Sequence, residues 1–148
     1  MRQRLGYSLA DMLVVIAIMG VLTAMAAPKM KNVRSQAELG SAKARVASYL
    51  ATARAAAIQR GSSVNFNITA GSDDLTVTDA STGSTIGSRV NIDPSLVQIS
   101  ASRSSVSFDS RGFATSLTNA GATFVLVAGS RRDSVCVNRM GMINQGRC

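Results

Sequence analysis

The chain has 148 residues and a formal net charge of +8 from 16 basic and 8 acidic residues, with no histidine and only two cysteines. The missing histidine removes the commonest general base and metal ligand, and no group of cysteines and carboxylates has the spacing of a metal site. We therefore expect no enzyme, no metal and no cofactor, and a single small core with an appendage.

An apolar stretch follows a short basic start. Residues 9–27 read LADMLVVIAIMGVLTAMAA, in which Asp11 is the sole charge. As a helix the stretch would be about 28 Å long, close to the hydrocarbon thickness of a bilayer. A carboxylate costs on the order of 2.5–3.5 kcal/mol at the centre of such a segment and less near its end. We predict a membrane-crossing helix in which Asp11 has a function.

An ordinary secretory signal peptide is the alternative. Its cleavage site would be Ala24-Met25-Ala26, which would release a soluble periplasmic protein that begins at Ala27. The acidic residue inside the apolar stretch, the Gly6-Tyr7 pair in front of it and the helical character that continues beyond Pro28 argue against this alternative.

The segment GYSLADMLVVIAIMGVLTAMAAP resembles the class III signal of type IV pilins and type II secretion pseudopilins. The resemblance implies that prepilin peptidase cuts after Gly6 and that Tyr7 becomes the methylated first residue. It also implies that Asp11 is the fifth-position carboxylate and Pro28 the twenty-second-position proline. Tyrosine replaces the usual phenylalanine, and aspartate is one methylene shorter than the usual glutamate.

Cleavage would create a new α-amino group at Tyr7, a cation that needs a counter-ion in apolar surroundings. The Asp11 carboxylate lies four residues along, where the helix dipole favours a negative charge, so pairing within one helix is conceivable. The resemblance implies instead that Asp11 meets the Tyr7 amine of a neighbouring subunit. Counting of flanking positive charges disagrees with the implied orientation, because only Arg2 and Arg4 precede the apolar stretch whereas Lys29, Lys31 and Arg34 follow it. The orientation therefore depends on the resemblance.

Residues 29–60 contain no proline and are rich in alanine, which predicts a second helical half that ends at Gly61. Pro28 should kink or loosen the helix. An apolar stripe should pack on a sheet, and the opposite basic face should be solvated. The stripe comprises Leu39, Val46, Leu50, Ala53, Ala57 and Ile58, and the basic face comprises Lys43, Arg45, Arg54 and Arg60.

Short apolar and β-branched runs alternate with turn formers over residues 62–148, the pattern of antiparallel strands with one buried face. The predicted fold is α+β: a long N-terminal helix, with a membrane half and a soluble half, packed on an antiparallel β-sheet domain. The expected parts are a leader at 1–6, a transmembrane and assembly helix at 7–28, a soluble half-helix at 29–61 and a β-rich domain at 62–148. The strand runs are 64–68, 75–77, 90–92, 97–99, 106–108, 123–127 and 135–137.

Three segments of this domain resemble the GspH/FimT branch of minor pilins and pseudopilins: AAAIQRGSSVNF, VSFDSRGFAT and DSVCVNRMGMI. We interpret Arg111-Gly112 as a turn that needs a glycine conformation. An even cysteine count in an exported domain favours a disulfide between Cys136 and Cys148, although two free thiols are the alternative.

The leading interpretation is a structural subunit, a minor pilin or pseudopilin of a type IV pilus or type II secretion pseudopilus, near the tip or initiating assembly. Its partners would be other pilins, prepilin peptidase and the inner membrane, in which it would be single-pass with its globular domain in the periplasm or in an extracellular filament. The alternative is DNA binding during DNA uptake, because phosphate contacts need little more than arginines. The candidate DNA-binding residues are Arg131, Arg132, Arg139 and Arg147.

Overall fold

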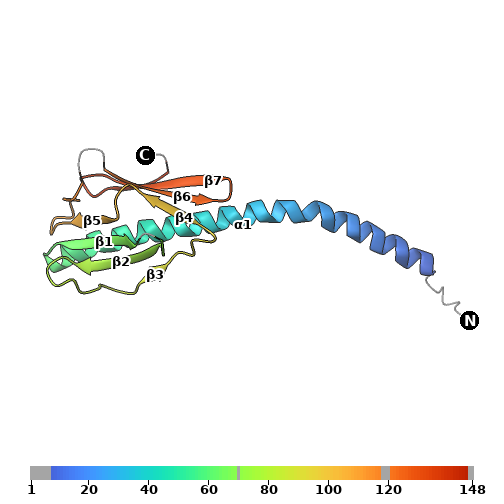
Figure 1. Cartoon of the computed structure of the whole chain (residues 1–148), viewed down its shortest axis with the longest axis horizontal. Helices are drawn as coiled ribbons and strands as arrows, with labels where there is room; N and C mark the ends of the chain where they lie inside the picture. The colour runs from blue at the N-terminus through green and yellow to red at the C-terminus, as the bar shows by residue number, and fades with distance from the viewer. Residues whose placement is uncertain (1–7, 70, 118–120, 147–148) are drawn as a thin grey trace, which may run out of the picture. The chain divides into compact units, whose positions relative to one another are not determined.

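The computed structural model describes residues 8–69, 71–117 and 121–146, with the side chains of residues 26–32 excepted. It divides into two compact units, Met1–Arg34 and Ser35–Cys148. The elements, labelled in Figure 1, are α1 (Leu9–Arg60), β1 (Val64–Thr69), β2 (Asp74–Asp79), β3 (Val90–Asn91), β4 (Gln98–Ala101), β5 (Ser105–Phe108), β6 (Ala122–Ala128), β7 (Arg131–Val137) and β8 (Ile143–Gln145). The predicted strand runs are confirmed.

Helix α1 ends where the sequence predicts. Its last residue is Arg60, and Gly61 follows with φ of +63°, the left-handed conformation in which glycine closes a helix without steric cost. The backbone is helical on both sides of Pro28 and through it. The helix is therefore one element of 52 residues that takes part in both units.

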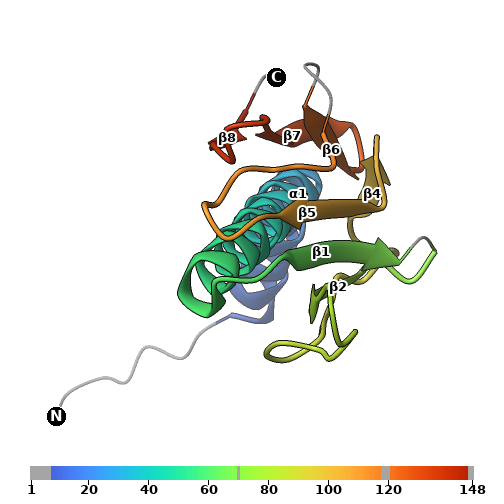
Figure 2. The same ribbon diagram turned by 90° about the vertical axis from the view of Figure 1, so that its left-hand side faces the viewer.

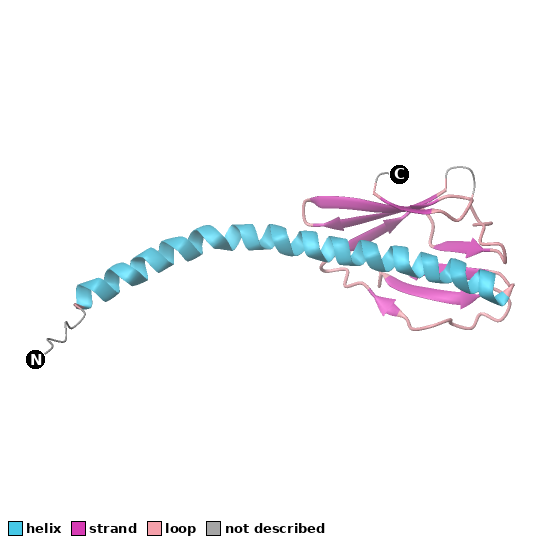
Figure 3. Cartoon of the chain, turned by 180° about the vertical axis from the view of Figure 1, so that it is seen from behind, coloured by secondary structure: helices cyan, strands magenta, loops and turns pink. Residues whose placement is uncertain are grey.

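The strands of the second unit form two four-stranded antiparallel sheets, ordered β3-β2-β1-β5 and β4-β6-β7-β8. Among the described strands the chain changes sheet three times, between β3 and β4, between β4 and β5, and between β5 and β6. In the view along the helix both sheets wrap the same stretch of α1, and the view from behind shows α1 running beside strands of both (Figures 2 and 3). The predicted α+β fold is confirmed, with its strands divided between two sheets.

Alternating burial in the strands places one face of each sheet on the helix. The burial of β6 alternates along all seven of its residues, and Phe66 of β1 meets Phe124 of β6 edge to face with ring centroids 5.6 Å apart. The two sheets therefore share one core. From the helix the core takes Leu39, Val46, Leu50, Ala53 and Ala57, all buried as predicted. Each fully buried large side chain contributes about 1.5–3 kcal/mol.

The prediction for Ile58 is wrong, because this side chain is half exposed. Ala53, Ala56 and Ala57 already cover the buried arc of this turn of the helix, and Ile58 lies about 100° beyond Ala57, outside that arc. Instead of entering the core, Ile58 covers the backbone at Gly112: a Cβ added there would lie 2.9 Å from Ile58 Cδ1.

The prediction of a solvated basic face is wrong for two of its four residues. Lys43 Nζ donates to Asp133 Oδ2 at 2.6 Å, and Arg54 Nη1 donates to the Gly141 carbonyl at 2.8 Å. Arg60 remains half exposed with Asp79 at 3.6 Å, and Arg45 is exposed as predicted. The partners of Lys43 and Arg54 lie 90 and 87 residues away, so helix periodicity could not reveal them.

Candidate assembly site

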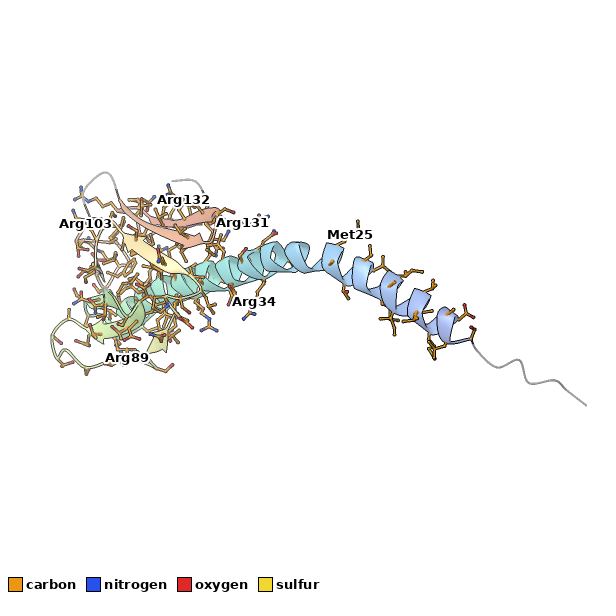
Figure 4. The ribbon with its side chains drawn as sticks, turned by 45° about the vertical axis from the view of Figure 1, so that its right-hand side comes forward. Met25, Arg34, Arg89, Arg103, Arg131 and Arg132 are labelled. Atoms are coloured by element: carbon orange, nitrogen blue, oxygen red, sulfur yellow. The ribbon has the colours of Figure 1, made fainter. Side chains whose placement is uncertain are left out.

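The first unit presents an apolar helix surface. The described part of the chain starts at Ser8, which caps α1: its hydroxyl lies 3.4 Å from the amide of Ala10, and its carbonyl accepts the amide of Asp11 at 3.0 Å. From there to Met25 side chains project all round the helix (Figure 4). The large apolar ones are exposed: Leu9, Met12, Leu13, Val14, Val15, Ile16, Ile18, Met19, Val21, Leu22 and Met25.

Two polar side chains interrupt this surface in different ways. The Thr23 hydroxyl donates to the carbonyls of Met19 and Gly20 at 2.7 and 3.0 Å, so its polarity is satisfied by the helix itself. The Asp11 carboxylate is exposed and has no hydrogen-bond or ion-pair partner among the described residues. Asp11 is therefore the one charge that this apolar surface offers to another molecule within the described part of residues 8–25.

The other residues expected at this site are not tested by the structure. Gly6 and Tyr7 lie outside the described residues, and of Pro28 only the helical backbone is described. Among the described residues, no helix combines the length and the apolar character that crossing a membrane requires.

The candidate DNA-binding arginines do not form one patch among the described residues. Arg131 and Arg132 are exposed at the start of β7, where Figure 4 labels both, and Arg139 follows the end of β7. Strand β7 alone, from Arg131 to Val137, spans about 20 Å, and Arg139 lies beyond it in the following turn. Arg147 lies outside the described residues.

A hollow lies beside the first residues of β7. Arg131, Arg132 and Lys43 line an open hollow of about 360 Å³ with Gln36 and Gly40 of α1. The hydrogen bond from Lys43 Nζ holds the pKa of Asp133 below its ordinary value. The negative charge of Asp133 is thus matched by Lys43, and the two arginines have no ion-pair partner among the residues that the structure describes.

The glycine interpretation of Arg111-Gly112 is confirmed, since Gly112 has φ of +81°. The Asp109 carboxylate accepts the amides of Arg111 and Phe113 at 3.0 and 2.9 Å and closes this turn. The first of the proposed disulfide residues, Cys136, lies on β7 with its Sγ 3.9 Å from the Gly146 carbonyl oxygen, and Cys148 lies outside the described residues.

The profile of the family described as Type II transport protein GspH matches residues 42–141, more than half of the chain. The chain belongs to the GspH family. A sequence search against curated proteins finds no significant match to this GspH-family chain.

Solved structures show the same fold. The type IV minor pilin FimU of Pseudomonas aeruginosa strain PAO1 aligns with a TM-score of 0.64 and 15% identity, over 76% of this chain and 90% of FimU. The minor pseudopilin EpsH from the Type 2 Secretion System of Vibrio cholerae aligns with a TM-score of 0.59 and 14% identity, over 73% of this chain and 95% of EpsH. Family and fold together identify a type IV pilin-like protein, a structural subunit and not an enzyme.

Proposed function

We propose that this protein is a minor pilin or pseudopilin, a structural subunit of a type IV pilus or of a type II secretion pseudopilus, that acts near the tip or initiates assembly. The observation that carries the proposal is the apolar surface of α1 from Leu9 to Met25, which the rest of the described chain leaves exposed. Apolar surface of this extent on a protein requires a lipid or protein partner. The GspH family match supports a filament as the final partner.

In this proposal, prepilin peptidase removes residues 1–6 and Tyr7 becomes a methylated N-terminus. Loss of Arg2 and Arg4 takes the net charge from +8 to +6. Residues 7–28 then anchor a single-pass protein in the inner membrane, with residues 29–61 and 62–148 in the periplasm or in the extracellular filament. Other pilins replace lipid around the same helix when the subunit is assembled.

The charge of Asp11 favours the incorporation of subunits that can pair with a neighbouring N-terminal amine. An isolated carboxylate and an isolated ammonium are each costly in an apolar bundle, whereas a hydrogen-bonded pair is tolerated. The absence of a partner for Asp11 among the described residues supports pairing with the Tyr7 amine of an adjacent subunit. A subunit without this carboxylate leaves a neighbour's amine uncompensated.

The test is incorporation of an Asp11→Ala variant into the filament fraction of a strain that assembles the machine. We expect normal membrane levels and a strong reduction in the sheared filament or pseudopilus fraction. An Asp11→Glu variant, which restores the carboxylate with one more methylene, should incorporate normally. Wild-type incorporation of the alanine variant would refute the role of Asp11.

We also propose that Cys136 and Cys148 form a disulfide. Cys136 Sγ lies 3.9 Å from the carbonyl oxygen of Gly146, which is only two residues before Cys148. Two residues span at most about 7 Å, and this separation in the chain is compatible with a bridge from Cys148 to Cys136. The bridge would tie the terminal segment to β7.

DNA binding is the second candidate function. It is favoured by the exposed Arg131 and Arg132, which have no ion-pair partner within the described part of the chain. Phosphate contacts by such arginines make binding salt-dependent. The detergent-solubilised full chain should bind duplex DNA at low salt and lose this binding in the Arg131→Ala/Arg132→Ala variant. An Arg139→Ala variant, changed at the other end of β7, serves as the control. Equal binding by both variants, or none by the wild type, would rule this candidate out.

A further inference from the structure

Three segments that are far apart in the sequence meet at the C-terminal end of α1, the end that faces the viewer in Figure 2. They are residues 54–58 of α1, the turn at 109–113 and the turn at 138–142, which we call the distal corner. Arg54 Nη1 donates to the Gly141 carbonyl at 2.8 Å, and the amide of Ala114 donates to the Arg139 carbonyl at 3.0 Å. Apart from Arg54, which directly precedes the first of them, these segments belong to the three motifs by which the sequence resembles the GspH/FimT branch.

The distal corner is held by direct backbone packing. A Cβ added at Gly141 would lie 2.1 Å from the carbonyl oxygen of Gly112, so the two turns touch where neither has a side chain. Each turn is also closed by its own hydrogen bonds: Asp109 accepts two amides of the first, and Asn138 Oδ1 accepts the amide of Met142 at 3.0 Å in the second. The surface above these turns is therefore preformed.

The three segments of the distal corner carry exposed apolar side chains. Ile58, Met140 and Met142 are 50%, 56% and 53% exposed. Among the described residues of Ser35–Cys148 the only other exposed large apolar side chain is Leu96, at 42%. Three of four such side chains thus lie at one corner. Methionine adapts its shape to a partner, and exposed apolar clusters mark interaction sites.

The rim of the distal corner is positively charged. Arg139 is exposed and has no ion-pair partner among the described residues. Arg111 is 76% exposed although it pairs with Asp109, whose side chain is only 15% exposed because it closes the turn. No other carboxylate occurs in the three segments. A matching partner surface would be apolar and carry carboxylates.

We propose that the distal corner docks onto an apolar, carboxylate-bearing surface of an adjacent pilin-type subunit. This inference rests on the proposed function and specifies which end of the domain makes the contact. The chain itself shows that the fold can carry the matching surface: Asp93 is exposed beside Leu96, at the edge of a hollow of about 420 Å³.

This hollow lies between the loop before β4 and the part of α1 around Ala42, with Glu38 and Arg45 also on its lining. Sixteen residues separate Ala42 from Ile58, about 24 Å along the helix. The corner and the hollow are therefore at different ends of the second unit's helix, and one copy cannot fill its own hollow. Contacts of this head-to-tail kind propagate along a filament instead of closing a dimer.

The test places the photocrosslinker benzoylphenylalanine at Met140 of the full chain, in cells that assemble the filament. Illumination should join position 140 to a pilin-type subunit, in a peptide that holds an acidic residue near apolar ones; residues 92–97 of a second copy would qualify. The same probe at the exposed Ser130, at the end of β7 that lies away from the distal corner, serves as the control and should not give this adduct. No adduct at position 140, or adducts only with lipid or with proteins that are not pilin-like, would overturn the proposal.

A charge reversal supplies the second arm. Arg139→Glu should reduce the position-140 adduct roughly tenfold, the effect of about 1.4 kcal/mol at an interface. Arg89→Glu, the same change at an exposed arginine before β3, should leave the adduct unchanged. An unchanged melting temperature shows that both variants fold. Absence of the wild-type protein from the filament would contradict the proposed function itself. Normal incorporation together with an undiminished position-140 adduct in Arg139→Glu would contradict only the proposed pairing of Arg139 with carboxylates of the partner.

Discussion

Replacement of Gly141 by alanine tests how the two turns of the distal corner are packed. The new Cβ would lie 2.1 Å from the Gly112 carbonyl oxygen and 3.1 Å from Arg54 Nε. Backbone cannot rotate away as a side chain can, so one turn must move. Movement of Gly141 strains its hydrogen bond from Arg54, now 2.8 Å long.

Two contributions set the magnitude. A non-glycine residue at the φ of +72° that Gly141 adopts costs about 1–2 kcal/mol. Weakening of a hydrogen bond to a charged group costs about 1.5–3 kcal/mol more. The free energy of unfolding should therefore fall by about 2.5–5 kcal/mol. At roughly 4 °C per kcal/mol for a domain of this size, the melting temperature should fall by about 10–20 °C.

Gly129 provides the matched control for this experiment. It has φ of +59° in the turn between β6 and β7, but no atom lies within 4 Å of an added Cβ. Gly129→Ala should cost only the conformational 1–2 kcal/mol, about 4–8 °C. Thermal unfolding of the detergent-solubilised full chain, followed by circular dichroism, measures both variants. Equal losses for the two variants would refute the steric argument.

Two further predictions concern long-range ties. The Lys43 hydrogen bond lowers the pKa of Asp133 in the folded state. This pair therefore stabilises the fold above the unfolded pKa of aspartate, and its contribution is lost as the pH falls through the folded pKa. Urea unfolding between pH 7 and 3 should show a smaller loss of stability in Lys43→Gln than in the wild type, and an identical pH dependence would count against the pair. For the proposed disulfide, which closes a short loop, Cys136→Ser should destabilise the oxidised protein by about 3 kcal/mol. The difference in stability between variant and wild type should disappear under reductant. A difference that persists under reductant would mean that packing at Cys136, and not a disulfide, explains it.

The sequence predicts most of the architecture because the relevant signals are local. The alternation of apolar and polar residues over 64–68 and 123–127 predicts which face of each strand is buried. Gly61 predicts the end of α1, because glycine readily adopts the left-handed conformation that closes a helix. The N-terminal motif likewise predicts the apolar surface and its single carboxylate, Asp11.

The misses arise from contacts between distant segments. Lys43 and Arg54 occur at positions that helix periodicity assigns to solvent, yet their partners come from β7 and from the turn after it. The arginines near the C-terminus are close in sequence, but the extended geometry of β7 separates Arg131 from Arg139. Conversely, the distal corner unites three motifs whose proximity no spacing in the sequence indicates.

The intact mass of the protein extracted from the membrane tests the central claim most directly. That claim is that the apolar helix is kept and that its new N-terminus at Tyr7 is exposed for pairing with Asp11. The account predicts the mass of residues 7–148 with one added methyl group. A mass that corresponds to a chain beginning at Ala27, or to the intact chain from Met1, would contradict it.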